Sequence, residues 1–282
     1  MKNKITLVLT YYECPDMLRK QMDYWQNYSK EVTDNIQVLV IDDGSKLFPA
    51  KDVLNERETN VDLCLLRIKE DIFQNTMGAR NLGFHYAPEN WIWNLDMDHI
   101  VPTESIKAVI NMELKTSCFY LPARYRMGSL YDYEKMHRHS DTFIMTRKMF
   151  WDIGGYNEDY VKYYYNGAAG MFRQQLKRRD EFRVELEDVW TLYFSPSIIE
   201  DARPIQKRNR RRGLTVSEKP KNHLRFEWEK IILEQDHKEM KRKELIDAIL
   251  QNISYEEYTQ KTLQKMSTRS LKNIEESLSL SA

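Results

Sequence analysis

The chain has 282 residues, of which 41% are apolar and 30% are charged, a composition that supplies a packed core and excludes a disordered protein. Lysine plus arginine and aspartate plus glutamate both number 43, so net charge gives no reason to expect whole-surface binding to nucleic acid or to an anionic membrane. The three cysteines, Cys14, Cys64 and Cys118, form no CxxC pair, which argues against a zinc site or redox couple and favours a reducing, cytoplasmic setting.

Short aliphatic runs alternate with amphipathic stretches in the first part of the chain. We predict strands at 5–9, 36–41, 61–68 and 91–95. Pro15 and Pro102 occupy plausible first turns of two of the intervening helices. This alternation predicts a mostly parallel α/β sheet flanked by helices, in which ligands gather at the carboxyl ends of the strands. The first apolar run is too short to span a bilayer, so we expect no transmembrane segment.

The second part of the chain continues the same domain before its composition changes. We predict a strand at 139–146, a Gly-Gly turn, a helix at 171–178 and a strand at 182–194. Residues 195–221 are rich in proline, serine and basic groups, and residues 224–280 have an almost continuous helix-forming composition. We therefore expect an α/β domain over residues 1–215 and a helical C-terminal extension over residues 216–282.

Two carboxylates, Asp96 and Asp98, follow the apolar run at 91–95, where the chain leaves the expected sheet. Mg²⁺ and Mn²⁺ take one or two carboxylates and complete their shell with phosphate oxygens and water. Such a site suits a nucleoside diphosphate leaving group. The alternative is a solvated acidic turn, but the position after a buried strand favours a metal site.

Two other segments carry side chains that suit a nucleotide. The sequence DDGS at 42–45 follows the strand at 36–41. A carboxylate there can accept the N–H of a nucleobase imide, although an Asp-Gly turn before a capped helix is the simpler interpretation. In the sequence MGAR at 77–80, the glycine permits close backbone approach and Arg80 can face a phosphate. By itself this segment is equally an ordinary helix start.

Together these features resemble the family-2 glycosyltransferases and their GT-A relatives over roughly residues 4–194. The resemblance rests on five ordered segments: TYY at 10–12, IDDGS at 41–45, GARNLG at 78–83, DMD at 96–98 and GGYNEDY at 154–160. It implies a GT-A, Rossmann-like fold and transfer of a sugar from a nucleoside diphosphate donor, with a UDP-sugar expected, to a hydroxyl group. The acceptor stays open between polysaccharide, lipid-linked glycan, protein and modified nucleic acid.

The resemblance also implies roles for individual residues. It places the nucleotide against Thr10, Tyr12, Asp42, Asp43 and Arg80. It places Mn²⁺ or Mg²⁺ at Asp96 and Asp98, and the sugar beside Gly154 and Gly155. GT-A relatives often take a third metal ligand from a histidine that follows the core, and His223 is the best candidate here. His99 adjoins the acidic pair, whereas His85, His137, His139 and His237 have no motif support.

A basic segment precedes His223. Six lysines and arginines lie between Arg203 and Arg212, among them Arg208 and Arg211, which we expect at the donor. A loop of this kind would close over the diphosphate and neutralise the charge on the departing phosphate. It would equally suit an anionic acceptor such as nucleic acid, or form a solvated linker.

One part of the family pattern is missing. Inverting members usually carry an acidic pair after the Gly-Gly turn, and one carboxylate removes the acceptor proton. Here Ala168 and Ala169 stand in that place. Three explanations compete: an engineered double substitution, which we favour; a retaining mechanism that needs no enzymic base; and a substitute base at Asp159 or Glu158.

Two other classes of function compete with an active transferase. A non-catalytic module would keep the nucleotide-sugar pocket and lack turnover. A nucleotidyltransferase of related fold would need a glycine-rich phosphate loop directly after the first strand, and the sequence TYYE at 10–13 contains no glycine.

Overall fold

The structure, a computed structural model, describes residues 2–72, 75–88, 91–128, 132–160, 167–202, 224–252, 267–268 and 271–272. The chain divides into two compact units, residues 1–231 and 232–282. The domain boundary expected near residue 215 lies outside the described residues, and the division in the structure comes after Ile231.

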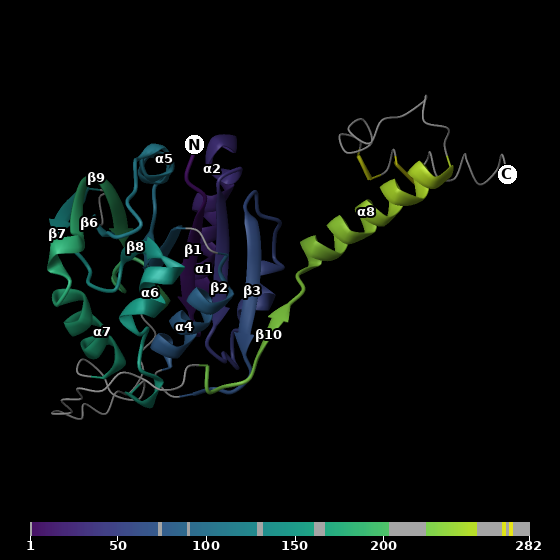
Figure 1. The fold of residues 1–282 in the computed structure, drawn as a ribbon. Coiled ribbons are helices and arrows are strands. Elements are labelled where there is room, and N and C mark those ends of the chain that lie inside the picture. The colour runs from purple at the N-terminus through teal and green to yellow at the C-terminus, as the bar shows by residue number, and fades with distance from the viewer. Residues whose placement is uncertain are drawn as a thin grey trace. The chain divides into compact units, whose positions relative to one another are not determined.

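Four parallel strands form the centre of the sheet, in the order β3-β2-β1-β4, of which β3, β2 and β1 are labelled in Figure 1. They are β1 (Ile5–Tyr11), β2 (Ile36–Asp42), β3 (Asp62–Ile68) and β4 (Trp91–Asp96). Every residue of β1 is buried, as expected for parallel strands that are covered on both faces and therefore read as continuous apolar runs. The mostly parallel α/β sheet predicted from the sequence is confirmed at this centre.

Strands of mixed direction, with both antiparallel and parallel pairings, extend the sheet beyond β4. They are β5 (His99–Ile100), β6 (Phe119–Met127), β7 (Tyr133–Met136), β8 (Phe143–Thr146) and β9 (Arg183–Tyr193). From β4 the order continues β8-β6-β9-β5, and β7 pairs with β6. The β6–β9 register shifts between Pro122 and Ala123, because proline has no N–H for the ladder and is tolerated at such irregularities.

Helices connect the strands of this unit. They are α1 (Pro15–Gln26), α2 (Lys30–Thr33), α3 (Ala50–Leu54), α4 (Thr76–Tyr86), α5 (Thr103–Asn111), α6 (Arg147–Ile153) and α7 (Ala168–Lys177). Short 3₁₀ turns lie at Glu158–Tyr160, Asp180–Phe182 and Glu200–Ala202. Pro15 begins α1 as predicted. None of the helices in the described part of the chain is both long and apolar enough to cross a membrane.

One hydrophobic cluster holds α4, α6 and α7 against the sheet. Phe84 of α4 stacks on Phe150 of α6 at a centroid distance of 3.7 Å, and Phe150 packs against Phe172 of α7 at 5.3 Å. All three rings are at most 1% exposed. Burial of such side chains stabilises a fold by roughly 1.5–3 kcal/mol each, so the cluster fixes the helices that carry the expected site residues.

The segment that follows residue 223 departs from the predicted helix. Residues Trp228–Ile231 form β10, which pairs antiparallel with β3. Trp228 also packs edge-on against Tyr86 of α4 at 5.9 Å. Helix propensity is a weak preference that tertiary contacts override, and here the open side of β3 and the Tyr86 ring decide the conformation. In the second unit the structure describes α8 (Glu234–Asn252), which is helical as its composition predicts.

Candidate functional site

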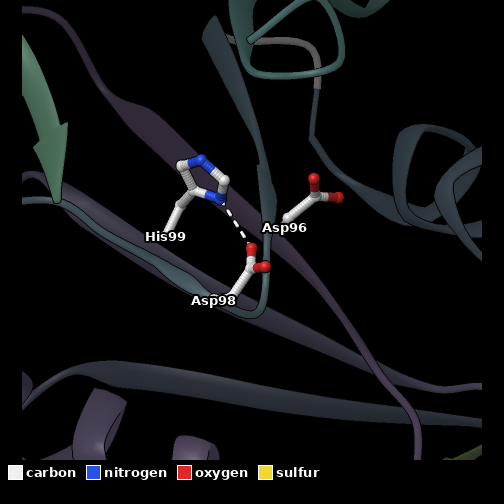
Figure 2. A group of neighbouring side chains, drawn as sticks. All are labelled: Asp96, Asp98 and His99. Carbon is white, nitrogen blue, oxygen red and sulfur yellow. Dashed lines mark hydrogen bonds and ion pairs between the residues drawn. The ribbon is translucent and has the colours of Figure 1, made fainter. Parts of the chain in front are cut away.

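The acidic pair lies at the carboxyl end of β4, along the edge of the sheet where the other central strands also end. Asp96 is the last residue of β4, Asp98 lies in the tight turn that follows, and His99 is the first residue of β5. Ligand atoms of these three residues lie within 4.8 Å of one another. Figure 2 shows the imidazole of His99 turned toward Asp98, whose Oδ1 lies 2.7 Å from His99 Nδ1. The oxygen-rich set fits a hard divalent cation.

Arg80 reaches the same place from α4. Its side chain is 1% exposed, contacts Asp96 through Nη2 and lies 3.8 Å from Asp141 through Nη1. Burial by itself would lower the pKa of the guanidinium, but Asp96, Tyr156 and Asp141 outweigh it and raise the pKa. Arg80 therefore stays charged beside the acidic pair, where it offsets part of the carboxylate repulsion and presents a fixed positive charge.

The turn before β8 completes this side of the site. His139 Nδ1 lies 3.3 Å from Asp96 Oδ2, and burial lowers the pKa of this imidazole, against the opposing effect of Asp96. Asp141 lies between Arg80 and Arg173 of α7, 3.7 Å from Arg173 Nη1. Arg80, Asp141 and Arg173 thus form a chain of charged side chains from Asp96 to α7, the helix that carries the two alanines.

The residues expected at the nucleotide line the same edge of the sheet. Thr10 of β1 stands in register with Asp96 on one side and Ile41 on the other. Tyr12 donates a hydrogen bond to Asp71 at 3.1 Å, and burial together with that carboxylate raises the pKa of Tyr12 to about 12. The tyrosine therefore remains a neutral hydroxyl at physiological pH.

The two carboxylates after β2 make different contacts. Asp42 accepts the backbone N–H groups of Ser45 at 2.8 Å and Ala50 at 2.9 Å, which holds the turn into α3. Asp43 accepts a hydrogen bond from Asn75 at 3.0 Å. Burial raises the pKa of both carboxyls, more strongly for Asp43. Asp42 thus shapes the loop, and Asp43 is the one tied to the segment that begins α4.

The Gly-Gly turn ends α6 and is locked against α4. Gly154 and Gly155 have φ of 111° and 61°, a left-handed conformation that glycine adopts without strain. A Cβ on Gly155 would also lie 2.7 Å from the Trp151 ring. Asn81 of α4 then accepts the N–H of Tyr156 at 2.9 Å and donates to its carbonyl at 2.8 Å.

Glu158 and Asp159 bind the described segment that begins at Leu224. Glu158 is buried, and its carboxylate accepts the backbone N–H groups of Leu224 at 2.7 Å and Arg225 at 2.9 Å as well as the Asn81 amide at 2.7 Å. Asp159 pairs with the Arg225 side chain near the surface. The carboxylate of Glu158 is therefore occupied by three donors, an arrangement that serves anchoring.

This anchoring predicts a stability effect for Glu158→Gln. In the variant, the side-chain N–H₂ group would face backbone N–H donors that the carboxylate accepts in the parent chain. We therefore expect the free energy of unfolding to fall by about 1–3 kcal/mol. Asp159→Asn, which removes an exposed ion pair, should cost about 0–1 kcal/mol. Urea unfolding of both variants provides the measurement. If Glu158 were a catalytic base, Glu158→Gln would instead keep its stability and lose turnover.

Ala168 and Ala169 occupy the first turn of α7. Ala168 is 1% exposed and belongs to the hydrophobic cluster, whereas Ala169 is half-buried. Arg173 stands one helical turn after Ala169 and contacts Ser140 at 3.2 Å. The two positions are therefore not equivalent, because Ala168 is enclosed by apolar side chains whereas Ala169 is partly accessible to solvent.

Some expected site residues cannot be placed in the structure, and two residues at the site were not expected there. Arg208, Arg211 and His223 lie outside the described residues. His139 and Asp141 lie at the acidic pair although no motif marks them, because a turn between β7 and β8 brings them to the end of β4. The only sequence signal for them was their polar character just before an apolar run.

The family model described as glycosyl transferase family 2 matches residues 6–179, and no match was found among curated proteins. Among solved structures, TarS from S. aureus in complex with UDP-GlcNAc superposes with a TM-score of 0.56 at 13% identity, covering 68% of this chain and 58% of that one. GalNAc-T7 with UDP, GalNAc and Mn²⁺ gives 0.53 at 11% identity, covering 69% and 44%.

These structural likenesses concern the fold, and this chain spans less than two thirds of either neighbour. The family match extends from β1 to just past the end of α7, and so includes the acidic pair, Arg80 and the Gly-Gly turn. Both findings agree with a GT-A architecture. The chain belongs to glycosyl transferase family 2.

Proposed function

We propose that this protein transfers a sugar from a nucleoside diphosphate donor, with UDP as the expected nucleotide, to an acceptor hydroxyl in a reaction that depends on Mn²⁺ or Mg²⁺. The observation that carries the proposal is the group of Asp96, Asp98 and His99 at the carboxyl end of β4, with the buried charge of Arg80 beside it. The neighbours solved with UDP-GlcNAc, and with UDP, GalNAc and Mn²⁺, support the choice of donor and metal.

Asp96 and Asp98 would hold the cation. When bound, a divalent ion supplies positive charge to the oxygens of a diphosphate. Arg80 presents its guanidinium from a water-poor environment, where a fixed charge acts more strongly than at the surface. Thr10, Tyr12 and Asp43 border the same edge of the sheet and would contact the nucleoside, while the Gly154–Gly155 turn would border the sugar.

A screen of labelled UDP- and GDP-sugars with Mn²⁺, and again with EDTA, tests the proposal. Donor hydrolysis and transfer to saccharide, lipid-linked, protein and nucleic-acid acceptors are measured in parallel. Metal-dependent consumption of one donor supports the proposal. Binding of no nucleotide sugar under either condition overturns it.

A non-catalytic nucleotide-sugar-binding module is the second candidate. The alanines in the first turn of α7 favour it, because alanine accepts no proton from an acceptor hydroxyl. It predicts metal-dependent donor binding without hydrolysis or transfer. Product stereochemistry, where turnover occurs, separates a retaining mechanism from an inverting one.

A further inference from the structure

Each carboxylate of the acidic pair has an imidazole of its own. His139 Nδ1 lies 3.3 Å from Asp96 Oδ2, and His99 Nδ1 lies 2.7 Å from Asp98 Oδ1. The two rings face each other at a centroid distance of 5.1 Å and an angle of 33°. Imidazole nitrogens from two separate parts of the chain therefore lie against the acidic pair.

The two contacts differ in kind. A distance of 2.7 Å between His99 and Asp98 is that of a hydrogen bond. The 3.3 Å between His139 and Asp96 is close to the separation of about 3 Å that neighbouring ligand atoms have on an octahedral ion with bonds of about 2.1 Å. His99 is 1% exposed, whereas the His139 side chain is 23% exposed and Asp96 25%. The side chains of His139 and Asp96 are thus partly accessible to a ligand from solvent, whereas His99 is enclosed.

The same strand, β4, helps to hold both His139 and Asp96 in place. The N–H of Thr142 donates to the His139 carbonyl at 3.1 Å, and the Thr142 hydroxyl lies 3.3 Å from Nδ1 of the same ring. Asn94 of β4 donates its side-chain amide to the Asp141 carbonyl at 2.5 Å. Because β4 ends in Asp96, one strand fixes both the carboxylate and the turn that carries the imidazole.

We propose that His139 supplies a nitrogen ligand to the cation at Asp96 and Asp98, and that His99 orients Asp98 through its hydrogen bond. The inference rests on the metal-dependent donor binding proposed above. A nitrogen ligand suits Mn²⁺ better than Mg²⁺, which prefers an all-oxygen shell. His139 is therefore a source of preference for Mn²⁺.

Electron spin-echo envelope modulation of Mn²⁺ bound to the full chain with UDP tests the ligand directly. A coordinated imidazole nitrogen modulates the Mn²⁺ echo. We expect this ¹⁴N modulation, per bound ion, in the parent chain, in His99→Gln and in the control His137→Gln, whose exposed ring lies on the same turn. It should vanish in His139→Gln. Absence from the parent, or persistence in His139→Gln, overturns the proposal.

Calorimetry separates this inference from the function on which it rests. With UDP present, His139→Gln should weaken Mn²⁺ binding by about tenfold or more and Mg²⁺ binding by less, which narrows the preference between the metals. An unchanged Mn²⁺ affinity in His139→Gln, or equal losses of affinity for both metals, overturns the role of His139 and leaves the proposed function standing. Equal UDP affinity of the parent chain in Mn²⁺ and in EDTA overturns the proposed metal-dependent function as well.

Discussion

Asp98→Ala should remove most of the Mn²⁺ dependence of UDP binding. Removal of a residue that merely orients a metal ligand typically costs 10–100-fold in metal affinity, so we expect removal of the ligand itself to cost at least about 100-fold. Asp98 is 5% exposed, and few other groups can take its place. Titration of the variant with UDP, first in Mn²⁺ and then in EDTA, should give nearly equal affinities.

Two matched changes control this experiment. Asp96→Asn keeps a partner for the buried Arg80 guanidinium, whereas Asp96→Ala would leave that charge without its nearest carboxylate and destabilise the fold. We expect Asp96→Asn to reduce the Mn²⁺ dependence of UDP binding less than Asp98→Ala does. Asp62→Asn changes an exposed acid at the amino end of β3, far along the strand direction from the site. Loss of Mn²⁺ dependence in Asp62→Asn would contradict the assignment.

Ala169→Asp should raise the rate of sugar transfer by about 10²–10⁴-fold, the usual contribution of a general base. An acidic residue in the first turn of α7 also suits the helix dipole, and Arg173 lies at i+4 on the same face. A base acts on the acceptor proton, so donor affinity should scarcely change. Steady-state kinetics with a fixed donor and varied acceptor provide the measurement.

The neighbouring position serves as a contrast. Ala168→Glu would place a carboxylate in the hydrophobic cluster, where an unpaired charge is strongly unfavourable, so this variant should lose stability in urea unfolding. Ala169→Asn has nearly the size of aspartate without its basicity and should leave the rate low. Brisk turnover by the parent chain, unchanged in Ala169→Asp, would refute the missing-base interpretation and favour retention or a substitute base.

The central sheet was predictable because its strands are buried on both faces. Continuous apolar runs mark β1, β2, β3 and β4, and the polar residues of the site follow these runs directly in the sequence. The family resemblance, based on those same segments, is confirmed by the family match. Local sequence is sufficient where one strand and the residue after it determine the geometry.

Long-range placement was not predictable in the same way. A strand was expected from residue 139, but β8 begins at Phe143, and residues 139–142 form a turn that faces Asp96. β6 was missed because Pro122 interrupts its pattern. The anchoring role of Glu158 was equally hidden, since it depends on the backbone of Leu224, far along the chain. In each case the deciding partner lies on another element.

The pairing of β10 with β3 has a consequence for how the chain tolerates shortening. Without β10, the backbone N–H and C=O groups on that side of β3 would be open to another molecule, and such strands promote aggregation. Leu65 and Leu66, which lie opposite β10, are almost wholly buried. A chain that ends before Trp228 should therefore be poorly soluble, whereas one that ends after Ile231 retains its own protective strand.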